Sequence, residues 1–108
     1  MSNVFEKGKV LNLSGQIEYS DGGVVSKQVL KNEVGNITLF SFDKGQMLSE
    51  HTALFDAMVQ VIDGKAEIRI DGKLSVLQTG ESIIMPANMP HALFAPERFK
   101  MILTMIKG

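Results

Sequence analysis

The chain has 108 residues, with 11 basic and 12 acidic side chains, a formal net charge of −1 and no cysteine. This length suits one domain with one hydrophobic core. Because the charges are spread along the chain, no basic surface is offered to nucleic acid, which we exclude as a partner. Disulfides, thiol nucleophiles and thiolate metal ligands are excluded by the lack of cysteine, so any metal ligands must be nitrogen or oxygen atoms.

Residues 1–9 show no hydrophobic pattern, and we expect them to form a flexible arm or one exchanged with a neighbouring subunit. The remaining residues, 10–108, are predicted to form a single domain. No apolar stretch is long enough to span a membrane, and the first residues lack the apolar segment of a secretory signal. We therefore expect a cytoplasmic protein without a membrane partner.

Short runs of β-branched and aromatic residues predict strands. These runs lie at residues 24–30, 36–42, 66–70, 73–77, 81–85 and 99–106. Asp-Gly pairs, which favour tight hairpins, occur at Asp21-Gly22, Asp63-Gly64 and Asp71-Gly72. The last run is apolar on both faces and predicts a strand buried on both sides. This rhythm of strands and turns predicts an all-β sandwich or barrel.

The segment 48–62 permits two interpretations. Apolar residues recur there at helical spacing, and Ser49 could serve as the N-cap of a helix. The run from Val59 to Ile62 instead fits a strand, and the neighbouring segments are strands.

Two stretches, Gly45 to Gly64 and Gly80 to Ala95, carry fixed residues at a characteristic spacing. They resemble the paired motifs of the cupin family. The first motif is Gly, five residues, His-x-His, three or four residues, Glu, six residues and Gly. The second is Gly, five residues, Pro-x-Gly, two residues, His, three residues and Asn. The resemblance implies a double-stranded β-helix, an RmlC-like jelly-roll barrel whose motifs form facing hairpins around a pocket. It also favours strands over a helix at 48–62.

In that family, two histidines and a glutamate of the first motif and the histidine of the second bind one divalent metal. His51 and His91 match the first and last of these ligands, whereas Ala53 and Ala57 stand at the other two positions. Asp56 is adjacent to the missing carboxylate, but strand alternation should point it away from the pocket. His51 and His91 therefore form an incomplete metal site, and we do not expect firm binding of Fe, Mn, Ni or Zn.

The resemblance and strand alternation together predict the lining of the pocket, where His51 and His91 should face each other. The predicted lining residues are His51, Ala53, Phe55, Ala57, Val59, Met85, Met89, His91 and Leu93. Three roles stay open for the two histidines: binding a small molecule, binding a metal, or packing without any chemistry.

Replacement of two polar ligands by alanine makes such a pocket larger and more apolar. Our first hypothesis is therefore a binding module for a small, partly apolar ligand, metal-independent or weakly metal-binding, and not an enzyme. The alternative is a cupin enzyme, either a metal-dependent dioxygenase or isomerase or a metal-free acid–base catalyst, although no catalytic residue is identified. A third hypothesis is an assembly domain, and we expect a homodimer that uses residues 99–106 or exchanges N-terminal strands.

Overall fold

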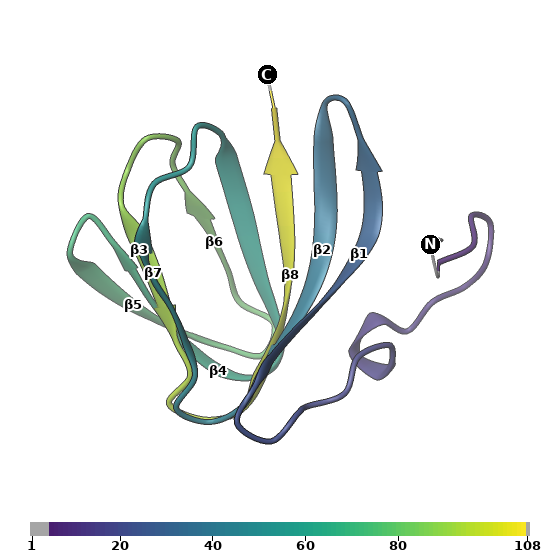
Figure 1. The fold of residues 1–108 in the computed structure, drawn as a ribbon, viewed down its shortest axis with the longest axis horizontal. Helices are drawn as coiled ribbons and strands as arrows, with labels where there is room; N and C mark the ends of the chain where they lie inside the picture. The colour runs from purple at the N-terminus through teal and green to yellow at the C-terminus, as the bar shows by residue number, and fades with distance from the viewer. Residues whose placement is uncertain (1–4, 108) are drawn as a thin grey trace.

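A computed structural model describes residues 5–107, which are almost entirely β-structure (Figure 1). The elements are η1 (Leu13–Gly15), β1 (Val24–Asn32), β2 (Gly35–Phe42), β3 (Met47–His51), β4 (Asp56–Ile70), β5 (Lys73–Gln78), β6 (Ser82–Met85), β7 (His91–Phe94) and β8 (Phe99–Ile106). The all-β prediction is confirmed, and residues 48–62 belong to strands β3 and β4 and their connection. Among residues 5–107, no helix is long and apolar enough to cross a membrane.

The strands form a curled antiparallel sheet in the order β1-β2-β8-β4-β7-β3 (Figure 1). The first part of β4 pairs with β6 and β8, and its last part pairs with β5 and β7. We call the strands β1, β2, β8, β6 and the first part of β4 sheet A. The strands β3, β7, β5 and the last part of β4 form sheet B. Since β4 belongs to both, its bend turns the inner faces of the two sheets toward each other.

The bend of β4 lies at Asp63-Gly64, where the Asp-Gly pattern predicted a hairpin. That prediction is wrong, because β4 continues through both residues and its pairing with β8 shifts register between Val61 and Asp63. Gly64 has a φ of +81°, and a Cβ atom there would lie 1.8 Å from the carbonyl oxygen of Arg98. The glycine thus permits close contact with the backbone of Arg98 within one long strand, and no turn between two strands forms there.

At Asp71-Gly72 the predicted hairpin is present and joins β4 to β5. Both turn residues have positive φ, 51° and 80°, as a two-residue turn of type I′ requires. Ile70 pairs with Lys73, so the register follows the turn. As expected, Ile68 is buried in the core while Arg69 is exposed on the other face.

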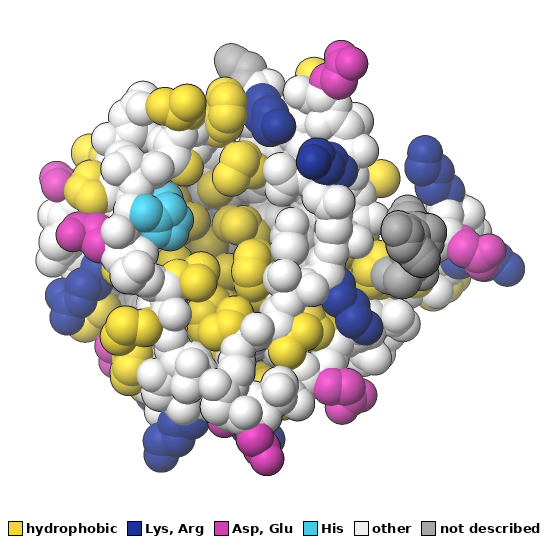
Figure 2. Space-filling model, viewed as in Figure 1, with side chains coloured by type: hydrophobic (Ala, Val, Ile, Leu, Met, Phe, Trp, Pro, Cys, Tyr) yellow, Lys and Arg dark blue, Asp and Glu magenta, His cyan; other side chains and the backbone are white. Residues whose placement is uncertain are grey.

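The core lies between the inner faces of the two sheets. Its buried members are Phe42, Ala57, Val59, Val61, Ala66, Ile68, Leu77, Met85, Leu93, Ala95, Phe99 and Met101. The rings of Phe42 and Phe99 stack with their centroids 4.4 Å apart. Figure 2 shows one face of the molecule, which is hollowed at its centre, with apolar side chains on the floor and histidine surface at the margin.

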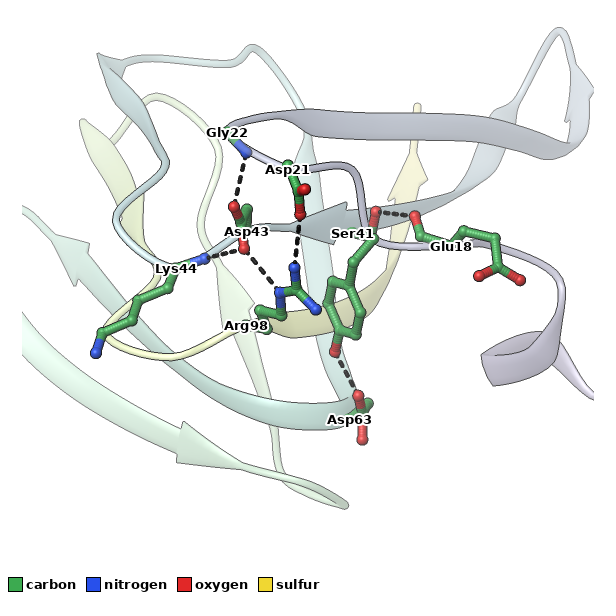
Figure 3. Close-up of polar contacts among 9 residues, drawn as sticks. Glu18, Asp21, Gly22, Ser41, Asp43, Lys44, Asp63 and Arg98 are labelled. Carbon is green, nitrogen blue, oxygen red and sulfur yellow. Dashed lines mark hydrogen bonds and ion pairs between the residues drawn. The ribbon is translucent and has the colours of Figure 1, made fainter.

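The N-terminal segment, residues 5–23, packs against the outer face of sheet A. Within it, Ile17 is buried, the carbonyl of Glu18 accepts a hydrogen bond from Ser41 Oγ (Figure 3), and the carbonyl of Ser14 accepts one from Lys100 Nζ. The arm predicted at residues 1–9 lies partly outside the described residues, which begin with the buried Phe5.

Strand β8 is buried on its inner face at its beginning, as expected, but its outer face is less buried. Phe99 and Met101 are fully buried inward, and Lys100 on the outer face is half-buried beside the ring of Tyr19. Ile106, at the end of the outer face, is 66% exposed. The prediction of a strand buried on both sides is therefore wrong for the C-terminal end of β8. Tyr19 covers the outer face only near Lys100, where the strand begins.

Candidate functional site

His51 and His91 lie in contact on neighbouring strands of sheet B. His51 is the last residue of β3, His91 is the first residue of β7, and the two are directly paired in the register. Their ring centroids are 4.3 Å apart and their planes meet at 65°, an edge-to-face arrangement. Two residues far apart in the sequence are thus held together by one antiparallel pair.

Each imidazole is oriented by its own backbone. The Nδ1 atom of His51 lies 2.8 Å from the carbonyl oxygen of Ser49, and that of His91 lies 3.3 Å from the carbonyl oxygen of Met89. Because a carbonyl oxygen can only accept, the ring nitrogen in each bond must donate. In its neutral form each ring then carries its lone pair on the other nitrogen, Nε2.

The two rings differ in burial, and this affects the protonation of His91. His91 is 5% exposed, whereas His51 is exposed. Burial lowers the pKa of His91, its hydrogen bond to Met89 raises it to a lesser extent, and a positive charge on His51 lowers it further. At neutral pH the buried ring is therefore favoured in its neutral form.

The two alanines at the other motif positions are placed differently. Ala57 is 4% exposed and lies on the inner face of sheet A, paired with Met85 of β6 and Met105 of β8. Ala53 lies between β3 and β4, and its carbonyl accepts a 2.7 Å hydrogen bond from Asn88 N. One alanine thus forms part of the apolar inner wall, while the other ties the two motifs together through its backbone.

Asp56, next to the missing carboxylate position, has a different partner. Its Oδ1 accepts a 2.8 Å hydrogen bond from Ala87 N in the loop between β6 and β7. Asp56 is exposed while Ala57 is buried, as strand alternation predicted. The carboxylate therefore holds the loop that leads to His91.

The other predicted lining residues are at different depths. Val59, Met85 and Leu93 are buried members of the core. Phe55 is half-buried in the connection between β3 and β4, and Met89 is 39% exposed in the loop before His91.

Three neighbours of the site were missed by the sequence analysis. Ile70 pairs with His91, Met105 pairs with Ala57, and Asn36 pairs with Met105. Alternation from the buried Phe99 and Met101 could have placed Met105 on the inner face. The positions of Asn36 and Ile70 depend on pairing between strands that are distant in the sequence, and no local pattern predicts that pairing.

The residues present do not fit the metal site that the cupin motifs imply. Of the four ligand positions, Ala53 and Ala57 have no side-chain donor atom. Among residues 5–107, no group of three or more histidine, aspartate or glutamate side chains could hold a metal ion. Two imidazoles without a carboxylate supply no negative charge to a divalent cation.

Comparison with known proteins supports the family resemblance. The cupin domain profile matches residues 38–107. A conserved protein of unknown function from Streptococcus pyogenes is 38% identical, with a TM-score of 0.91 over 100% of this chain and 96% of that one. A search of curated proteins gave no match.

Two further solved structures have the same fold. A cupin 2 conserved barrel domain protein from Leptotrichia buccalis is 41% identical, with a TM-score of 0.87. The match covers 90% of this chain but only 47% of the Leptotrichia protein. An RmlC-like cupin from Shewanella frigidimarina is 25% identical, with a TM-score of 0.79 over 99% and 93% of the two chains. With the matched domain and the curled antiparallel sheet, these likenesses show that the chain belongs to the cupin family and folds as an RmlC-like double-stranded β-helix.

Proposed function

We propose that this cupin domain binds a small, partly apolar molecule in the hollow of its barrel, where His51 and His91 hold the polar group of that molecule without a metal ion. The observation that carries the proposal is the pair of imidazoles in contact, 4.3 Å between centroids, together with a hollow that has an apolar floor and histidine surface at its margin (Figure 2). Cavities lined mainly by apolar groups with a few convergent polar ones are typical small-molecule sites.

A metal titration tests the metal-free part of this proposal. Fe(II), Mn(II), Ni(II) and Zn(II) are titrated calorimetrically into the wild-type chain and into the double variant Ala53→His, Ala57→Glu, which restores the missing side chains. We expect stoichiometric binding by the variant alone. Stoichiometric binding by the wild-type chain that disappears in His51→Ala would contradict the proposal and favour the metal-dependent dioxygenase or isomerase.

Native mass spectrometry of the purified protein tests the binding part. We expect a small molecule of defined mass to accompany the wild-type chain and to be lost from both His51→Ala and His91→Ala. Arg69→Ala is the matched control, since Arg69 lies on the outer face of the same sheet. A bound mass that is unchanged in both histidine variants would contradict a site at this pair.

We also propose that the chain works as a cytoplasmic homodimer. Exposed apolar side chains lie along the outer side of sheet A, at Leu30, Ile84 and Ile106, and Val34 is exposed in the turn between β1 and β2. Burial of such a patch against a second copy would remove it from water. Light scattering at micromolar concentration should give twice the mass of the chain, and Ile106→Glu should shift it toward the monomer. A wild-type monomer would contradict the proposal.

A further inference from the structure

The two histidines share a local geometry that fixes what they present to a ligand. Ser49 and Met89, whose carbonyls accept the hydrogen bonds from Nδ1, each lie two residues before the histidine concerned. The same local arrangement therefore occurs on both strands, and neither ring depends on the ligand for its orientation. A site arranged before binding loses less entropy when it binds.

In their neutral forms the two rings offer acceptors and no donors. Each Nδ1 hydrogen is already given to a carbonyl, so each Nε2 has a lone pair. The neighbours of His91 on the sheet, Ile70 and Leu93, are apolar and add no donor. A hydroxyl group can donate to such a nitrogen, whereas a carboxylate or an ether has no hydrogen to give.

The inner wall of the barrel suits a ligand with a flat, polarisable ring. Ala57 is paired with Met85 on one side and with Met105 on the other, so a methyl group stands between two methionines at this position. Thioether sulfur makes favourable contacts with aromatic rings, and methionine adapts to irregular shapes. Methionine side chains thus flank the position where a carboxylate stands in the family motif.

We infer that the ligand is a hydroxyl-bearing aromatic molecule, a phenol in the simplest case, whose hydroxyl donates to Nε2 of His51 or His91 while its ring packs beside Ala57, Met85 and Met105. This inference rests on the proposed function and adds the chemical class of the ligand. It distinguishes a neutral donor from an anion or an ether of the same size.

The first arm of the test reads the protonated nitrogen directly. Long-range proton–nitrogen NMR spectra of the free protein at neutral pH distinguish ring nitrogens with and without hydrogen. We expect Nδ1 to be protonated and Nε2 unprotonated in both histidines. An Nε2 hydrogen on both rings would overturn the inference while leaving the proposed function intact.

The second arm compares three probes of similar size: para-ethylphenol, para-ethylanisole and para-ethylbenzoate. We expect the phenol to bind about five- to tenfold more tightly than the other two, because one net hydrogen bond has that effect on affinity. The preference should be lost in His51→Phe, His91→Phe or the double variant, which keep a ring but remove its nitrogens. Arg69→Ala should keep it.

The outcomes separate this inference from the proposed function. Tighter binding of the benzoate, or equal binding of all three probes in wild type and variants, would overturn the assignment of a hydroxyl donor. If none of the probes binds while native mass spectrometry still shows a histidine-dependent molecule, only the ligand class is wrong. If that molecule is also missing, the proposed function fails with it.

Discussion

The two ends of the barrel differ in how deeply their side chains are buried, although they are built from the same strands. Where β8 begins, Phe42 and Phe99 are fully buried and stacked, and Gly64 is in close contact with the backbone of Arg98. Toward the other end of β8, Met105 is only half-buried, and on the facing sheet His51 is exposed. One end is thus closed by packing, while the other keeps polar groups accessible.

The closed end is also tied from outside. Arg98 bonds to Asp43 at 2.7 Å and to Asp21 at 3.0 Å, and Asp43 accepts a hydrogen bond from Gly22 N, so the N-terminal segment is joined to the barrel (Figure 3). Tyr19 lies beneath Arg98 and bonds to Asp63 at the bend of β4. The difference between the ends teaches that many stabilising contacts lie away from the histidine pair, so we expect the exposed His51 to be replaceable without loss of the fold.

The largest expected effect is at the bend of β4. Gly64→Ala places a Cβ atom against the carbonyl of Arg98 and forces alanine into a positive φ. We expect the free energy of unfolding to fall by more than about 5 kcal/mol, measured by urea denaturation. Gly72→Ala is the control, with a similar φ of +80° but nothing within 4 Å, and should cost about 1 kcal/mol. Equal losses in both variants would contradict the role of the contact with Arg98.

Gly64 also shows what the sequence could and could not predict about the fold. The strands and the hairpin at Asp71-Gly72 follow from local preferences, which the pattern contains. At Asp63-Gly64 the same dipeptide lies inside a continuous strand, because the strand partner Phe99 and the carbonyl of Arg98 come from a distant part of the chain. Local propensity predicts the positive φ, but not whether the strand ends there.

The second expected effect contrasts Phe99, which is fully buried in the core, with His51, which is exposed at the proposed site. Phe99→Ala removes a fully buried ring that stacks on Phe42 and should cost about 3–5 kcal/mol in the free energy of unfolding. His51→Phe, at an exposed position, should change it by less than about 0.5 kcal/mol while reducing ligand binding. Both variants are measured by the same urea titration. A similar loss of stability in both would contradict this contrast and show that His51 also stabilises the fold.

A smaller effect is expected from the pH dependence of the histidine end. Burial holds the pKa of His91 below the ordinary 6.5, so the unfolded chain binds this proton more readily than the folded one. The contribution of His91 to stability is therefore present above pH 6.5 and lost as the pH falls through the lowered pKa. Urea denaturation between pH 7.5 and 5 should show a shallower loss in His91→Phe than in the wild type. Parallel profiles would contradict this prediction.

The site was predictable to the extent that the motifs describe it. The spacing of His51 and His91 in the two motifs predicted that they face each other, and the structure brings their rings into contact. Met105 could have been found from alternation along β8. The choice of Nδ1 as the donor could not, because it depends on the backbone carbonyls of Ser49 and Met89, whose positions no side-chain pattern records.

The smallest expected effect belongs to the polar contacts of the closed end. The hydrogen bond from Arg98, with those from Gly22 N and Lys44 N, lowers the pKa of Asp43 to about 2 from an ordinary 3.8. A carboxyl group whose pKa is lowered by folding stabilises the protein above its unfolded pKa, and this contribution is lost as the pH falls from about 4 to 2. Asp43→Asn should therefore flatten the acid limb of the stability profile in that window. Arg98→Gln should flatten it too, but less, since the two backbone donors to Asp43 remain; an acid limb as steep as the wild type's in both variants would show that the carboxylate has no preferential interaction in the folded state.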